Sequence, residues 1–594
     1  MLKERNELDS VYQWNLDSLY PSDDEWEKDY IMSETLFAEL KTKEGKVLES
    51  AKSLEDTIQL YLDSSRKLSR IATYAKMKQD ENTKLSHYQS LNARAETLDV
   101  AFKEASSYLV PEIMMGDENL IKTYLSDDAL KLYSQFMENI LRSRAHTLSP
   151  EGEALLAQAA ELFSAPSNAF GMLNGADLKF PNVMDENDEE ASLTHGSFIP
   201  FMMNKDRRVR EDAFKKYYKV FDDHKNTFAS LLSSEVKKNI FNAKARKYES
   251  ARAAALFENN VPESVYDQLI EAVHKNLPSM HKYMALRKRM LGVKKLRPFD
   301  LYVPLIEDVD MKYTYDDAKK TVLDSLQILG KDYTETVKSS FKDSWIDVYE
   351  NVGKRSGAYS WGTYDSKPYI LLNYHDELGD MFTLTHELGH SLHSYYTRNS
   401  QPFVYGNYSI FVAEVASTTN ESLLNKHLLD NVSDKQERLY LLNNYLENFR
   451  GTVFRQTMFA EFERDIHAYA ADGGALTAEQ LCKMYRELNL KYYGETLDMD
   501  AELDLEWARI PHFYYNFYVF QYATGFSSAV ALADKMTKEG QEAVTAFKEF
   551  LSAGSSDYPI EVLKKAGVNM ETPGPVNDAL DVFNALVDEM EKLV

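Results

Sequence analysis

Apolar residues recur at three- and four-residue intervals through most of the chain, which is the period of an amphipathic helix. Within residues 23–180 the pattern is clear in DEWEKDYIMSETLFAELKTKEGKVLES and SHYQSLNARAETLDVAFKEASSYLV. It returns in DRRVREDAFKKYYKVFDDHKNTFASLLSSEVKKNIFNAKA, and again from residue 381 almost to Val594. The pattern therefore predicts a mainly α protein built from long helices.

Two stretches interrupt the helical period. The first, DLKFPNVMD followed by the acidic residues Glu186–Glu190 and ASLTHGSFIPFM, predicts a β-hairpin with a solvated turn. The second, DVYENVGKRSGAYSWGTYDSKPYILLNY, is rich in glycine and aromatic residues and contains the apolar run Tyr369–Leu372. It predicts a small β-sheet that ends just before the next helix.

The length of 594 residues is too great for one small core, so we expect two or more lobes. We divide the chain into an N-terminal helical region, residues 1–200, and a second region, residues 201–594, which holds the candidate chemistry.

The amino-acid composition limits the binding partners and the cellular compartment that we expect. The 94 acidic residues outnumber the 68 Lys and Arg residues and give a formal net charge of −26. Such a surface repels phosphate backbones and anionic lipids, so we expect neither a nucleic-acid nor a membrane partner. Cys482 is the single cysteine, which excludes an intrachain disulfide and any zinc site built on several cysteines. The N-terminal residues lack the apolar core of a signal peptide, and no stretch has about 20 uninterrupted apolar residues. We therefore expect a cytoplasmic protein.

The segment TLTHELGHSLH, residues 383–393, places unusual polar residues in an apolar helical pattern. His386 and His390 are four residues apart, so on a helix both rings can approach one ion at about 2.0–2.1 Å. Glu387 follows the first histidine and could act as a general base on a water molecule, as in the H-E-x-x-H pattern. The alternative is a pair of ordinary hydrogen-bonded histidines, but their position directly after a predicted strand favours a metal site. We expect His393 to pack or to support the ligands, because three histidines would crowd a tetrahedral ion.

A catalytic zinc ion needs a third protein ligand. The metzincin pattern would require glycine at 393 and histidine at 396, and the chain has His393 and Tyr396, so that pattern is excluded. Downstream, YSIFVAEVASTTNESLLNKHLL carries Glu414 and Glu421 seven residues apart, on one face of a helix. Glu414 lies among apolar residues and is the better ligand, whereas Glu421 could orient an imidazole. Gly389, inside the helix, indicates close packing.

The motif FTLTHELGHSLH, with the glutamate of FVAEVASTTNE 24 residues after His390, closely resembles the thimet-oligopeptidase-like zinc peptidases. WNLDSLYPSDDEWEKD, GKRSGAYSWG and IPHFYYNFYVFQYATG are similar to the bacterial oligoendopeptidase F branch, so the resemblance spans nearly the whole chain. It implies one Zn²⁺ per chain held by His386, His390 and Glu414, with Glu387 as the catalytic carboxylate. It also implies a two-lobed helical shell around a deep channel that admits short peptides.

A late aromatic cluster lies in WARIPHFYYNFYVFQYATG. On a helix, His512, Tyr515, Tyr518 and Tyr522 would share one face, where they could donate hydrogen bonds to an oxyanion or form a core stripe. The resemblance implies that His512, Tyr515 and Tyr522 hold the scissile carbonyl oxygen, and it leaves Tyr518 open.

We interpret the chain as a zinc metallo-endopeptidase that acts on short peptides, with Glu387 activating water. One alternative is a metallo-carboxypeptidase with the same zinc site, and another is a non-enzymatic helical peptide-binding protein. The strand predicted in SKPYILLNY, with Gly353 and Gly357, could bind an extended peptide by strand addition.

Overall fold

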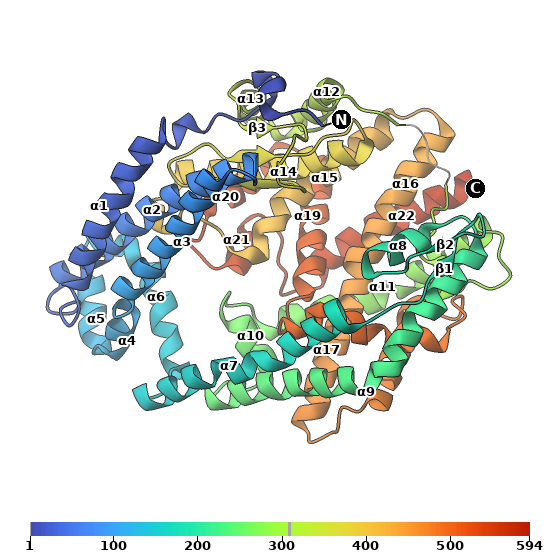
Figure 1. Cartoon of the computed structure of the whole chain (residues 1–594), viewed down its shortest axis with the longest axis horizontal. Helices are drawn as coiled ribbons and strands as arrows, with labels where there is room; N and C mark the ends of the chain where they lie inside the picture. Colours follow the sequence, from blue (N-terminus) through green and yellow to red (C-terminus); the bar gives the residue numbers. More distant parts are fainter. Residues whose placement is uncertain (1, 307–310) are drawn as a thin grey trace. The chain divides into compact units, whose positions relative to one another are not determined.

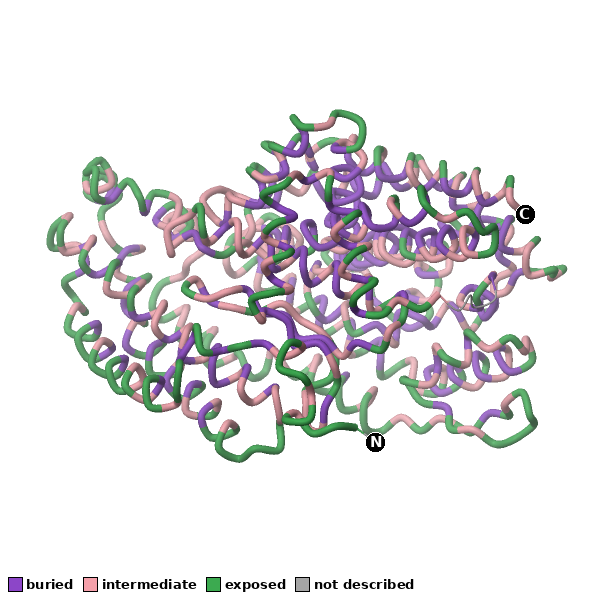
Figure 2. Tube along the Cα trace, turned by 90° about the horizontal axis from the view of Figure 1, so that it is seen from above, coloured by how far each residue is buried: buried purple, intermediate pink, exposed green. Residues whose placement is uncertain are grey.

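The computed structural model describes residues 2–306 and 311–594. Helices dominate and the strands are short, so the expected mainly α fold is confirmed (Figure 1). Buried and exposed residues alternate along individual helices, as amphipathic sequences require (Figure 2). Among the described residues no helix combines the length and the apolar character needed to cross a bilayer.

Contacts divide the chain into two compact units, each assembled from three separate segments. Unit 1 comprises Met1–Ala145, Met311–Leu428 and Leu532–Gly567, and unit 2 comprises His146–Asp310, Leu429–Ala531 and Val568–Val594. The functional division at residue 200 stays a prediction, as does the substrate channel.

Unit 1 begins with three long helices that lie side by side, α1 to α3 (Figure 1). Their apolar faces bury Trp26, Leu40 and Ile71, and Tyr369 and Leu371 from the small sheet join the same core. The described helices of this unit, including the two that continue into unit 2, are α1 (Asp23–Lys41), α2 (Ala51–Glu81), α3 (Ser86–Ser106), α4 (Leu109–Met115), α5 (Glu118–Leu125), α6 (Ser134–Leu141), α12 (Tyr315–Ser325), α13 (Lys331–Lys342), α14 (Leu378–Ser400), α15 (Ile410–Asn431), α19 (Phe520–Glu539), α20 (Gln541–Ala553) and α21 (Pro559–Lys565).

The sheet of unit 1 has the strand order β3-β5-β4. The strands are β3 (Ile346–Asp347), β4 (Tyr359–Trp361) and β5 (Tyr369–Leu371), with β5 parallel to β3 and antiparallel to β4. Helix α14 packs against β4 and β5, which confirms the prediction of a small sheet beside the histidine helix. Strand addition to SKPYILLNY was a wrong expectation, because β5 is central and both of its edges are already paired.

Unit 2 contains the predicted hairpin in a shorter form. β1 (Val183–Met184) and β2 (Glu190–Ala191) are antiparallel and enclose the acidic turn. The second strand was predicted too long, because the Thr194 side chain caps α8 and the chain turns helical at His195. The helices of unit 2 are α7 (Pro150–Met172), α8 (His195–Met203), α9 (Arg207–Ala245), α10 (Ala251–Phe257), α11 (Glu263–Met290), α16 (Lys435–Phe449), α17 (Arg455–Ala471), α18 (Ala478–Tyr493) and α22 (Gly574–Leu593), with most of α19 and the end of α15.

Candidate metal centre and aromatic cluster

Helix α14 carries the first two candidate ligands. A capping box between Glu377 and Asp380 begins the helix. His386 and His390 lie one turn apart, and their Nε2 atoms are 3.1 Å from each other. The helix is anchored by three leucines at four-residue intervals, each fully buried: Leu384, Leu388 and Leu392. Burying each leucine stabilises the fold by about 1.5–3 kcal/mol, which holds the imidazole pair on a rigid support.

A close helix crossing brings α15 against α14. A Cβ atom at Gly389 would lie 2.4 Å from the Cα of Ser417 and 2.9 Å from the carbonyl oxygen of Ala416. Glycine is therefore required for this approach, which confirms that Gly389 marks close packing. Glu414, three residues before Ser417 on α15, reaches the histidine pair as a consequence.

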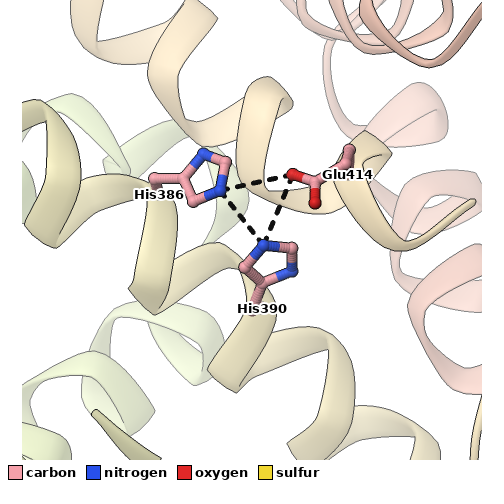
Figure 3. Close-up of side chains that lie close together, drawn as sticks. All are labelled: His386, His390 and Glu414. Carbon is pink, nitrogen blue, oxygen red and sulfur yellow. Dashed lines mark hydrogen bonds and ion pairs between the residues drawn. The ribbon is translucent and has the colours of Figure 1, made fainter. Parts of the chain in front are cut away.

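The carboxylate of Glu414 completes a triangle of donor atoms (Figure 3). Its Oε2 lies 3.3 Å from Nε2 of His386 and 3.4 Å from Nε2 of His390. In a tetrahedral zinc site with bonds of 2.0–2.1 Å, the ligand atoms are about 3.3–3.4 Å apart. Within residues 2–306 and 311–594, this is the one group of three or more His, Cys, Asp and Glu side chains whose donor atoms all lie within 4.8 Å of one another. The three side chains can thus hold one metal ion of zinc's size.

Glu421 binds the second ring nitrogen of His386, which is not part of the donor triangle. Its carboxylate accepts a hydrogen bond from Nδ1, so Nε2 is the ring nitrogen that faces Glu414 and His390. Burial lowers the pKa of His386, but the hydrogen bonds with Glu414 and Glu421 outweigh burial and raise it to about 10. The Glu414 side chain is 56% exposed, so desolvation raises its pKa only in part, and hydrogen bonds from the two imidazoles hold the pKa well below its usual range. Two carboxylates, those of Glu414 and Glu421, thus face the imidazole pair, and their negative charge suits a cation.

Glu387 is a nearly buried carboxyl, 7% exposed, on the same helix. Burial raises its pKa, and the negative charge of Glu414 acts in the same direction. The two histidines and a backbone hydrogen bond from Ser360 of β4 oppose this rise without cancelling it. A carboxyl whose pKa is raised towards neutrality is suited to take up and release a proton.

The late aromatic cluster belongs to unit 2 and does not form the single helix face that its spacing predicts. His512 lies in a short 3-10 helix, Pro511–Tyr514, whereas Tyr522 lies in α19, which begins at Phe520. Between them the chain turns, with positive φ angles of 47° at Asn516 and 58° at Phe517. The helical prediction was wrong because this turn breaks the helical period.

The turn nevertheless gathers the predicted side chains. Nε2 of His512 lies 3.2 Å from the hydroxyl of Tyr522. The rings of Tyr515 and Tyr518 lie 5.5 Å and 6.4 Å from the imidazole, so Tyr518 joins the cluster as well. Tyr515 is 54% exposed. Burial lowers the pKa of His512 and the positive charge of Arg455 lowers it further, which favours a neutral imidazole. The imidazole and the three hydroxyl groups together form a set of side chains that can donate hydrogen bonds.

Comparison with known proteins identifies the family. Residues 201–582 match peptidase family M3, and residues 112–180 match the family described as oligopeptidase F. The chain belongs to peptidase family M3. The protein is accordingly an enzyme, a metallopeptidase, and the interpretation as a non-enzymatic peptide-binding protein is excluded.

Relatives of this peptidase cover its whole length. Oligopeptidase PepF of Bacillus subtilis is 49% identical over 594 residues, which is 100% of this chain and 89% of that protein. The crystal structure of oligoendopeptidase-F from Enterococcus faecium has a TM-score of 0.74 at 40% identity, covering 96% of this chain and 99% of its own. A crystal structure from Chlamydophila abortus has a TM-score of 0.96 at 35% identity and covers 100% of both chains. The resemblance to the oligoendopeptidase F branch is therefore confirmed.

His393 of the peptidase packs instead of joining the donor triangle. It is 1% exposed, and its ring stacks on Tyr408 at 3.6 Å between centroids and lies 5.2 Å from Phe550. Burial holds its pKa well below the usual range, so the imidazole is neutral. Of the two roles expected for this residue, the structure favours packing.

Ser360 is the neighbour of the donor triangle that sequence reasoning missed. Its backbone bonds to Glu387, and its hydroxyl lies 2.8 Å from the hydroxyl of Ser391 on α14. A backbone group carries no residue-type signal, so only the packing of β4 against α14 reveals this contact.

Proposed function

We propose that this peptidase is a zinc metallo-endopeptidase that hydrolyses internal bonds of short peptides, with one Zn²⁺ per chain. The observation that carries the proposal is the triangle formed by His386, His390 and Glu414, whose sides of 3.1, 3.3 and 3.4 Å match a tetrahedral zinc site. Two imidazoles and one carboxylate leave a fourth position, which is the usual donor set of catalytic zinc. The names of the relatives, oligopeptidase and oligoendopeptidase, support peptides as substrates.

Zinc in such a site supplies Lewis acidity, which lowers the pKa of water towards about 7 and polarises a peptide carbonyl. Glu387 takes the proton of the attacking water and passes it to the departing amine. Its burial supports this role, because a raised pKa lets one carboxyl act first as base and then as acid. Glu421 keeps His386 in the tautomer that offers Nε2 to the cation.

His512, Tyr515 and Tyr522 stabilise the oxyanion of the tetrahedral intermediate in this proposal. Support comes from the hydrogen bond between His512 and Tyr522 and from the lowered pKa of His512, because a neutral imidazole keeps one N–H that can donate. Donors of this kind contribute typically about 3–4 kcal/mol to the transition state. A cytoplasmic location, which was the expectation from the sequence, also belongs to the proposal.

The metal arm of the test compares zinc content and turnover in three variants. Glu387→Gln should keep about one zinc per chain and lose roughly 10²- to 10⁴-fold in kcat, because only the proton carrier is removed. Glu414→Ala should lose zinc affinity as well as turnover. Glu549→Ala, an exposed position on α20, is the matched control and should change neither. Full zinc affinity in Glu414→Ala would show that another group is the third ligand.

The product arm uses an internally quenched peptide that is blocked at both ends. An endopeptidase cuts it, whereas a carboxypeptidase requires a free C-terminal carboxylate. An intact blocked peptide, together with stepwise shortening of an unblocked one, would replace our proposal with the carboxypeptidase alternative.

A further inference from the structure

The turn between His512 and Tyr522 is strained. Asn516 and Phe517 are consecutive residues with left-handed backbone conformations, at φ angles of 47° and 58°. Asparagine tolerates this region, but a bulky residue such as phenylalanine rarely adopts it. Such a conformation persists only where the surrounding structure holds it in place.

Three contacts within unit 2 hold Phe517. Its ring is 3% exposed and packs 4.5 Å from the ring of His467 and 5.8 Å from the ring of Tyr266. Its backbone N–H donates to Oε1 of Glu463 on α17, at 2.6 Å. Because that N–H is turned into the interior, the carboxyl is the group that satisfies it.

Glu463 is an unusual partner for this N–H. Its side chain is fully buried, and Oε2 has no hydrogen-bond partner among the described residues. The ionisable groups that face it are Glu235 from α9, Tyr266 from α11 and His467 from its own helix, while Lys238 pairs with Glu235. No cation therefore compensates Glu463 among these neighbours. Burial raises its pKa to about 8, so at neutral pH it is mostly an uncharged acid.

We propose that Glu463 is a positioning residue that fixes the turn at Asn516 and Phe517 and thereby sets His512 against Tyr522. It acts through the oxyanion role proposed above for those two side chains. A neutral acid is well matched to the task, since its carbonyl oxygen accepts from the amide without leaving a buried charge beside Glu235. Without the acceptor, the buried amide is unpaired and the strained turn can relax.

The test replaces Glu463 with methionine, which keeps the volume but cannot accept the bond, and with glutamine, which restores a neutral acceptor. Glu463→Met should lower kcat on the blocked peptide roughly tenfold or more, with KM changed less than about twofold. Glu463→Gln should recover kcat to within about threefold of the wild-type enzyme. Zinc content should be unchanged in both, because the proposed ligands belong to unit 1.

Glu461→Gln is the matched control, since it removes a nearly buried acid of the same helix that bonds His274 and Tyr492 instead of the turn. It should alter stability without the loss in kcat. If Glu463→Met does not fold, Glu463→Asp, which withdraws the acceptor by one methylene group, takes its place. Wild-type kcat in the folded variant, or failure of glutamine to rescue it, would overturn the positioning role.

Failure of the proposed oxyanion role can be distinguished from failure of the positioning role of Glu463. If His512→Ala and Tyr522→Phe both keep wild-type kcat, the oxyanion role itself is wrong. If they lose activity while Glu463→Met does not, only the positioning role of Glu463 fails.

Discussion

Two physical arguments predict opposite effects of the substitution Gly389→Ala on the stability of the protein. Gly389 lies inside α14, where alanine is favoured over glycine by about 1 kcal/mol of helix propensity. Considered alone, α14 should therefore become more stable. The contact with α15 predicts the reverse, because the new Cβ would lie 2.4 Å from the Cα of Ser417 and 2.8 Å from its backbone nitrogen.

The size of the effect follows from these distances. Ordinary van der Waals contact begins near 3.4 Å, so the two helices must separate by about 1 Å at the crossing. Overpacking of this kind typically costs about 1–3 kcal/mol, which exceeds the propensity gain. Glu414 moves with α15, so its distances of 3.3 and 3.4 Å to the imidazoles would grow beyond about 4 Å. Metal–ligand bonds tolerate only about 0.2 Å, so we expect zinc affinity to fall by at least 10- to 100-fold.

Competition with a chromophoric chelator measures the zinc affinity, and thermal unfolding measures the stability. Gly379→Ala is the matched control, because this glycine lies in the first turn of the same helix and its Cβ would meet nothing within 4 Å. The control should keep zinc affinity. A Gly389→Ala enzyme with wild-type zinc affinity and a higher Tm would refute the inferred role of the helix crossing.

Three further outcomes can be measured independently. Glu421→Gln should weaken zinc binding about 10- to 100-fold, because His386 loses its charged acceptor; unchanged affinity would refute that support. Tyr522→Phe should lower kcat with little change in zinc content or KM, as measured by steady-state kinetics and metal analysis, and equal losses in zinc would point to a structural effect instead. Glu463 has a pKa near 8 when folded against 4.5 for an ordinary glutamate, so its contribution to stability is fully present below about pH 4.5 and is lost as the pH rises through 8. The Tm of Glu463→Gln minus that of the wild-type enzyme should therefore increase between pH 5 and pH 8, and a constant difference would mean that Glu463 is already ionised.

The donor triangle was accessible from the sequence because local rules determine most of it. A four-residue spacing places His386 and His390 on one helix face whatever surrounds the helix. Glu414 was selected as a carboxylate among apolar residues, but its side chain is 56% exposed, so the cost of burial is not what places it there. The crossing at Gly389, which sets the distance of Glu414 from the imidazoles, was visible only as a glycine in an unfavourable place. Its partner Ser417 on α15 could not be read from the sequence.

Long-range pairing accounts for the expectations that failed in unit 1. The run Tyr369–Leu372 has the composition of a buried strand, and β5 is buried as that composition requires. Strand order is decided by which segments reach its two edges, β3 from upstream and β4 from the intervening loop. Neither partner can be assigned from the strand's own residues, so the open edge of the sheet was placed on the wrong strand.

The helix predicted through the aromatic cluster is not formed, for a reason that concerns the chemistry proposed for the cluster. Asn516 tolerates a left-handed conformation and was the one local sign of a turn, but nothing in the sequence indicates a left-handed conformation at Phe517. The conformation is imposed by Glu463, more than fifty residues earlier in the chain, and by the aromatic pocket of Phe517. A straight helix would separate His512 from Tyr522 by almost three turns, about 15 Å along the axis, whereas the strained turn brings them to 3.2 Å. The structure therefore departs from local helix preference at the turn that brings the two candidate donors, His512 and Tyr522, together. Backbone strain is often found at such functional positions.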